Sequence, residues 1–175
     1  MSKSVLRVKK IVDDNLHLPF EKLAGLMRED AARNDFLGFA AQAKTLAKEA
    51  VRDGDFNSAW RHFHEQKAHF MRHADNVAFT RTATIALDAS VSPDLANILR
   101  LEGRHSDALV HTVYWLATLG TPLPQRGIDK LRAYLNRCKL KNTTLSQMIL
   151  MVEDLGVAPD FSDIQSKIAG VIGKG

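Results

Sequence analysis

The chain has 175 residues, of which 45% are hydrophobic and 25% are charged, and its formal net charge is +4. This balance is typical of a folded globular protein and excludes a low-complexity chain. The single cysteine, Cys138, excludes a disulfide within the chain. No run of residues approaches the roughly 20 apolar positions that a membrane-spanning helix needs.

The compartment and the domain count follow from the same features. Basic residues near the N-terminus are not followed by a continuous apolar segment, so no secretory signal is predicted. Together with the lone cysteine, this favours a cytoplasmic protein that does not bind a membrane. Because no linker rich in Pro, Gly or Ser interrupts the chain, we predict one domain over residues 1–175.

Apolar residues recur every three or four positions along the chain, which predicts amphipathic helices. No stretch of six or more residues alternates strictly between apolar and polar positions, so a β-sheet is not expected. We therefore predict an all-α fold of about nine to ten helices. They are expected near residues 3–16, 19–34, 36–52, 56–73, 76–88, 92–103, 104–120, 125–138, 143–155 and 161–172.

Several residues are expected to define the ends of these helices. Gly54 tolerates the left-handed conformation that ends a helix, and Asp55 can cap the next one with its carboxylate. Asp160 is expected to cap the last helix. In the same way, Ser92 is expected to be a cap, with Pro93 in the first helical position. The short connections favour antiparallel neighbours, so we predict stacked helical hairpins, either a regular right-handed array or an irregular bundle.

Two segments of the chain repeat each other, residues 46–63 and residues 95–112. Leucine, alanine, glycine and alanine recur at a constant offset of 49 positions: Leu46, Ala47, Gly54 and Ala59 correspond to Leu95, Ala96, Gly103 and Ala108. Small residues let two helices approach closely, and the glycine makes the turn between them. We therefore predict that Ala47 faces Ala59 and Ala96 faces Ala108, each pair inside a helical hairpin.

This pattern resembles the tetratricopeptide repeat. Leu46, Ala47, Gly54, Phe56 and Ala59 match the family's positions, whereas the second segment has His105 in place of the aromatic residue. True tandem repeats recur about every 34 residues, so an additional helix has to lie between these two copies. The family also has a small residue later in the second helix of each repeat, where this chain has Gln66 in the first copy and Trp115 in the second. The resemblance implies a concave surface that binds a peptide or protein segment.

A histidine-rich helix is a candidate site. His62, Glu65, His69 and His73 recur at offsets that place them on one helical face. Imidazole and carboxylate groups that converge in this way can bind a metal ion, but the spacing differs from the HExxH motif of zinc proteases. A solvated polar face and a ligand-contacting face therefore stay open as alternatives to a metal site.

A basic helix is the second candidate. Between positions 126 and 141 the chain carries a cluster of cations with Asp129 as the single carboxylate. We expect Tyr134 to lie near the edge of this cluster, where its ring could stack on a base. This cluster could contact nucleic-acid phosphates or an acidic protein, or it could be a solvated face without a partner. The candidate nucleic-acid-binding residues are Arg126, Lys130, Arg132, Tyr134, Arg137, Lys139 and Lys141.

No arrangement typical of catalysis is present. Cys138 lies on an apolar stripe, where an inert buried thiol is expected, and the GxSxG, GxxxxGK[ST] and GxGxxG motifs do not occur. We predict no catalytic residue, no cofactor and no resident metal. The leading hypothesis is therefore a non-enzymatic module that binds a protein or peptide partner. Its candidate contacts are His62, Glu65, His69, His73 and Tyr114. The alternatives are a nucleic-acid-associated protein that uses the basic helix and a metal-binding helical protein.

Overall fold

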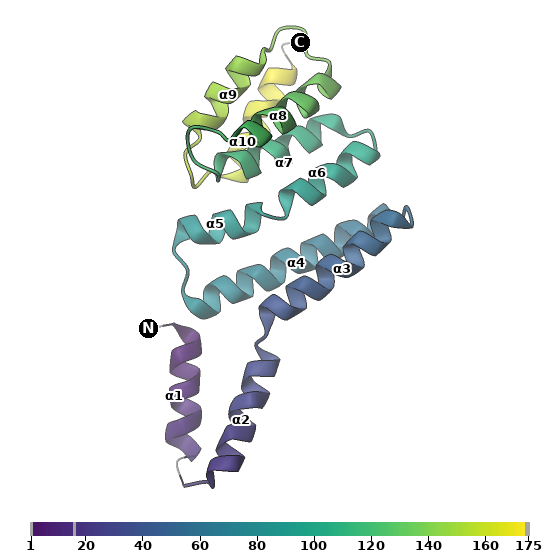
Figure 1. Ribbon diagram of the computed structural model, residues 1–175. Helices are drawn as coiled ribbons and strands as arrows, with labels where there is room; N and C mark the ends of the chain where they lie inside the picture. The colour runs from purple at the N-terminus through teal and green to yellow at the C-terminus, as the bar shows by residue number, and fades with distance from the viewer. Residues whose placement is uncertain (1, 16, 174–175) are drawn as a thin grey trace.

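The computed structural model describes residues 2–15 and 17–173, and those residues form helices without any β-strand (Figure 1). The predicted all-α class is therefore confirmed. The helices are α1 (Lys3–Asn15), α2 (Phe20–Arg33), α3 (Phe36–Arg52), α4 (Phe56–Val77), α5 (Arg81–Ala89), α6 (Ser92–Leu101), α7 (His105–Ala117), α8 (Gln125–Cys138), α9 (Leu145–Asp154) and α10 (Phe161–Ile172). Leu16, the predicted end of the first helix, lies outside the described residues. None of the described helices is both long enough and apolar enough to cross a bilayer.

One predicted helix start is wrong. The fifth helix was expected from residue 76, but α4 continues to Val77 and α5 begins only at Arg81. The chain turns at Ala78, which has a φ of 57°, in the left-handed region, and the Phe79 amide bonds the carbonyl of Ala74. Thr80 then caps α5 by accepting a hydrogen bond from the amide of Ala83. An alanine in the left-handed region is uncommon, which is why the sequence did not reveal this break.

Two of the predicted caps are confirmed, and one is wrong. The carboxylates of Asp55 and Asp160 accept backbone hydrogen bonds at the starts of α4 and α10. Ser92, by contrast, is the first residue inside α6, and the preceding residue Val91 occupies the cap position without a side-chain bond. The Ser92 side chain is buried, and its Oγ lies 3.4 Å from Nδ1 of His111. The Ser92 hydroxyl therefore contacts α7 and does not cap α6.

The two repeated segments form hairpins that turn in the same way. In α3–α4 the amide of Asp55 donates to the carbonyl of Ala50 at 2.9 Å, and in α6–α7 the amide of Arg104 donates to the carbonyl of Leu99 at 2.8 Å. The turn glycines have φ angles of +76° and +78°, which favour glycine. The predicted seam residues are all fully buried: Ala47, Ala59, Ala96 and Ala108.

The repeat loses its symmetry at its leucines. Leu46 on α3 is 42% exposed, whereas its counterpart Leu95 on α6 is fully buried. Leu95 packs in a cluster with Ala47 and Phe63 of the first hairpin, so α6 has a neighbour on a side where α3 has none. Leu46 is thus exposed because no second hairpin packs against its side of α3 as the first hairpin packs against Leu95.

Helix α7 is the centre of the C-terminal half. Nine of its residues are buried, and they lie all around the helix. A helix that is apolar on every side has to be enclosed by others. Accordingly, α7 packs against α5, α6, α8, α9 and α10, and the main apolar core is built around it (Figure 1).

Gly127 allows α8 to approach α7 closely. A Cβ added at this position would lie 2.8 Å from Cδ2 of Leu116, which is fully buried in the core, so the leucine would have to shift. We expect Gly127→Ala to lower the free energy of unfolding by about 1–3 kcal/mol through overpacking. Urea denaturation followed by circular dichroism measures this change.

Gly170 of α10 provides the matched control. An added Cβ there meets no atom within 4 Å, so Gly170→Ala should leave stability unchanged or raise it by up to about 1 kcal/mol. Equal effects of the two substitutions would contradict the close approach of α7 and α8.

Candidate functional site

A groove of about 540 Å³ runs between the first helices of the two hairpins, α3 and α6. It lies where the second hairpin contacts the first, and α4, the second helix of the first hairpin, contributes its floor. The lining residues are Thr45, Lys48, Val51, Arg52, Phe63, Asp94 and Asn97. The groove thus combines an apolar floor with polar and charged walls.

The floor of the groove belongs to the core of the first hairpin. Phe63 is almost fully buried and packs with Val91, Leu95 and Ile98 of the second hairpin and its approach, and Val51 packs at the margin of the same cluster. Because these side chains are held by the core, the floor is preformed. Such a surface can accept an apolar side chain without rearrangement of the protein.

The α3 wall of the groove is cationic. Lys44 lies 3.7 Å from the carboxylate of Asp94 across the groove, and Arg52 lies 3.8 Å from Glu49 on its own helix. Lys48 lies between them, and no carboxylate of the described residues comes within 4.0 Å of its ammonium group. Lys48 therefore supplies positive charge that the described part of the chain does not neutralise.

The cationic surface continues from α6 toward α8. Arg100 donates to Oδ1 of Asn97 through Nη2 at 2.8 Å, and its positive charge lies near Tyr134, where it partly opposes the rise in the pKa of that hydroxyl on burial. Burial lowers the pKa of Lys130, and the nearby carboxylate of Asp94 partly opposes that change. Asp94 is thus placed between Lys44 and Lys130, so cations from α3 and α8 compensate its charge.

The residues of the predicted basic helix do not form one free surface. Arg132 pairs with Asp129 at 3.3 Å, and Lys130 lies over the ring of Trp115 at 5.1 Å from its centroid. α8 ends at Cys138, so Lys139 caps it with a φ of 52° and Lys141 lies beyond it. Arg126 is exposed at the other end of the helix. The cations therefore point in different directions along and beyond α8.

The prediction that Tyr134 lies at an exposed edge is wrong. Tyr134 is only 5% exposed, and the guanidinium of Arg137 lies 5.8 Å from the centre of its ring. It occupies the position on α8 that packs beside Leu131 and Leu135 in the core. Its ring is therefore not available to stack on a base.

The predicted histidine face is divided among separate surroundings. Nδ1 of His62 lies 3.2 Å from the carboxylate of Glu65, His69 packs against Phe39, and His73 contacts Phe79 edge-on. Among the described residues, no three His, Cys, Asp or Glu side chains are grouped as metal ligands. The structure therefore brings His62 to Glu65 but holds His69 and His73 in other contacts along α4.

Tyr114, the remaining candidate contact, is buried. It is 5% exposed, and its hydroxyl donates to the carboxylate of Asp88 at 2.9 Å. The same carboxylate pairs with the ammonium of Lys67 at 2.9 Å. This arrangement joins α4, α5 and α7, and burial next to the Asp88 charge raises the pKa of the Tyr114 hydroxyl above its usual range. Tyr114 thus links helices and does not line a partner-binding surface.

Cys138 is half-buried, and burial raises the pKa of its thiol. A protonated thiol is a poor nucleophile, which agrees with the structural role expected from its apolar stripe.

Comparison of the chain with protein-family models, with curated proteins and with solved structures found no significant match.

Sequence reasoning missed a histidine cluster between α4, α7 and α10. His111 of α7 contacts the rings of Trp60 and Phe161, and Trp60 also packs against His64. Burial lowers the pKa of His111 to about 4, and the charges of Lys67 and His64 add to that effect more than Asp107 and Asp88 oppose it. The only sequence signal was a histidine inside an otherwise apolar helix.

Stability should therefore fall as the solution is acidified. An unfolded chain binds a proton at His111 near the ordinary pKa of about 6.5, whereas the folded chain does so only near pH 4, so acid favours unfolding across that window. For His111 alone, the loss between pH 7.5 and pH 5 is at most about 2 kcal/mol. Urea denaturation at several pH values measures it.

The control is His111→Phe, which keeps an aromatic ring and removes the proton-binding group. We expect this variant to show a smaller loss of stability between pH 7.5 and pH 5 than the parent chain, whatever its absolute stability. Parallel pH profiles for the two chains would show that His111 titrates normally in the folded state.

Proposed function

We propose that this protein is a non-enzymatic binding module that holds an extended, acidic protein segment in the groove between α3 and α6. The observation that carries the proposal is the combination of a preformed apolar floor at Phe63 with the unneutralised ammonium of Lys48 on the adjacent wall. Peptide-binding grooves use the same division between apolar pockets and polar groups that fix orientation.

Each part of the groove suits one part of such a segment. An apolar side chain can cover Val51 and Phe63, while a neighbouring carboxylate reaches Lys48 and Arg52. Asn97 accepts hydrogen bonds from Arg100 through its Oδ1, so its amide nitrogen can donate to a peptide carbonyl. Affinity would come from the apolar contact, and preference for acidic segments from the charges.

The same surface suits nucleic acid less well. Single-stranded nucleic acid is held by exposed aromatic rings next to cations. Here Arg137 covers Tyr134 and Lys130 covers Trp115, so two rings near the basic helix are already occupied.

We further propose that the hairpins form a tetratricopeptide-like array within one domain. The matching hydrogen bonds at the two glycine turns and the buried alanine seams support this proposal. In such an array, the first helices of successive hairpins line the binding surface, as α3 and α6 line this groove. A cytoplasmic location stays a prediction.

Fluorescence anisotropy with designed probes tests the proposal. The probes are a labelled peptide that alternates Asp or Glu with Leu or Phe, the same peptide with Lys at the acidic positions, and a single-stranded DNA. We expect the acidic peptide to bind most tightly. Reversing charge in the groove with Lys48→Glu and Arg52→Glu should weaken that binding at least about tenfold, because two favourable charges become repulsive.

The matched control is Arg72→Glu combined with Lys167→Glu. Both residues are exposed, neither lines the groove, and the change in net charge is the same. If the two double variants weakened binding equally, the effect would come from the overall charge of the protein, and the proposal of a specific binding groove would be wrong. Tighter binding of the DNA than of the acidic peptide would favour the nucleic-acid alternative.

A further inference from the structure

The α1–α2 hairpin lies outside the apolar cores of the protein. No described residue of either helix is buried, whereas each of the other described helices has at least one buried residue. Neither of the two apolar core clusters among the described residues includes a side chain of α1 or α2. In Figure 1 the hairpin projects from one end of the molecule. Apolar packing in a core therefore does not fix its position.

The hairpin contacts the rest of the protein through α1. α1 packs on α4, and α2 packs on α1. α2 makes no comparable contact with α3 or with any later helix of the described chain, although only two residues separate it from α3. The orientation of the hairpin therefore depends on the contact between α1 and α4.

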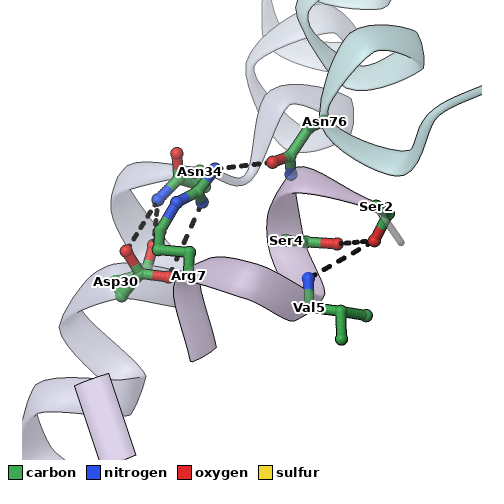
Figure 2. A network of polar contacts seen from close by, with 7 residues as sticks. All are labelled: Ser2, Ser4, Val5, Arg7, Asp30, Asn34 and Asn76. Atoms are coloured by element: carbon green, nitrogen blue, oxygen red, sulfur yellow. Dashed lines mark hydrogen bonds and ion pairs between the residues drawn. The ribbon is translucent and has the colours of Figure 1, made fainter. Parts of the chain in front are cut away.

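Arg7 makes the least exposed polar contact between α1 and α4 (Figure 2). Its Nη2 donates to Oδ1 of Asn76 at 2.6 Å, and its Nη1 lies 3.6 Å from the carboxylate of Asp30 on α2. The side chains of Arg7 and Asp30 are 30% and 22% exposed, and Asn76 is buried. Lys3 also pairs with Asp75, but these side chains are 63% and 65% exposed, and ion pairs in solvent contribute little stability. Arg7 is therefore the main polar connection to α4.

The two residues between α2 and α3, Asn34 and Asp35, have the properties of a hinge. The backbone amide and the side-chain amide of Asn34 both bond the carbonyl of Asp30, so Asn34 ends α2. Asp35 begins α3, because its carboxylate accepts a hydrogen bond from the amide of Gly38 at 3.0 Å. Each helix is thus completed by its own terminal residue. A rotation of the backbone between the two helices leaves the hydrogen bonds within both of them intact.

A cleft of about 490 Å³ lies beside this hinge. Its walls come from the end of α2, from the hinge and the start of α3, and from His73 and Asn76 of α4. Because an open space, and not packed side chains, separates α2 from α4 at this point, rotation at the hinge does not have to displace a packed core. The hinge and the cleft therefore allow the hairpin to change its angle once α1 is released from α4.

We propose that the α1–α2 hairpin is a movable arm, that the hydrogen bond from Arg7 to Asn76 holds it against α4, and that loss of this bond lets it rotate about Asn34 and Asp35. Within the arm, Asp30 orients the guanidinium of Arg7, and the side chain of Asn34 donates to Asp30 in turn. One chain of polar contacts thus runs from the hinge to the end of α4 (Figure 2). The helices of the arm stay folded in both arrangements, and only the angle between the arm and α4 changes.

Pulsed electron paramagnetic resonance on the full chain measures this angle as a distance between two spin labels. The labels are attached at the exposed positions Arg28→Cys on α2 and Arg61→Cys on α4, in a chain that also carries Cys138→Ser so that only the added cysteines react. We expect one narrow distribution of distances for this labelled chain. Adding Arg7→Ala should widen the distribution at least about twofold, because several orientations of the arm become populated. Circular dichroism checks that the helices remain.

Lys9→Ala is the matched control, because it removes the same charge from an exposed position of α1 that takes no part in these contacts. It should leave the distribution narrow. Asn76→Ala removes the acceptor on α4 without changing α1, so it tests the same bond even if Arg7→Ala unfolds the first helix. It should widen the distribution as Arg7→Ala does, and the double variant should be no wider than either single variant.

Three results would overturn the proposal. A broad distribution in the labelled chain that retains Arg7 would show that this residue does not hold the arm. An unchanged width in a folded Arg7→Ala or Asn76→Ala chain would show that other contacts fix the angle. Equal widening by Lys9→Ala would assign the effect to the charge of α1 in general and not to the bond with α4.

Discussion

Helix α7 has to be enclosed, and the arrangement of the C-terminal half follows from that requirement. Its apolar residues leave no side that could face water, so its neighbours have to surround it. The approach of α8 at Gly127 closes one side, and α6 joins α7 through the alanine seam. One side of α6 packs on α7, so another side is directed toward α3. Asp94 and Asn97 lie on the side directed toward α3, and the groove there therefore depends on the packing of α6 on α7.

The hairpins could be predicted from the sequence because single residues have distinct roles in them. Gly54 and Gly103 adopt the left-handed conformation that few other residues tolerate, and Asp55 caps the helix that follows. An alanine that recurs among apolar residues is equally informative, because its small side chain permits two helices to approach closely. Where a residue without such a preference makes the turn, prediction failed. Ala78 adopts the left-handed conformation at the end of α4, and an alanine side chain does not predict that conformation.

The candidate site could be predicted only in part, because periodicity assigns a residue to a side of its own helix and does not identify the neighbouring helix. Tyr134 and Tyr114 both border apolar stripes, and each is covered by a neighbour that the sequence does not reveal. Lys67 shows the same limit. It is on α4, and its partner Asp88 lies on another helix, α5. The groove was expected only as a surface between hairpins, and its residues became clear once α3 and α6 were placed together.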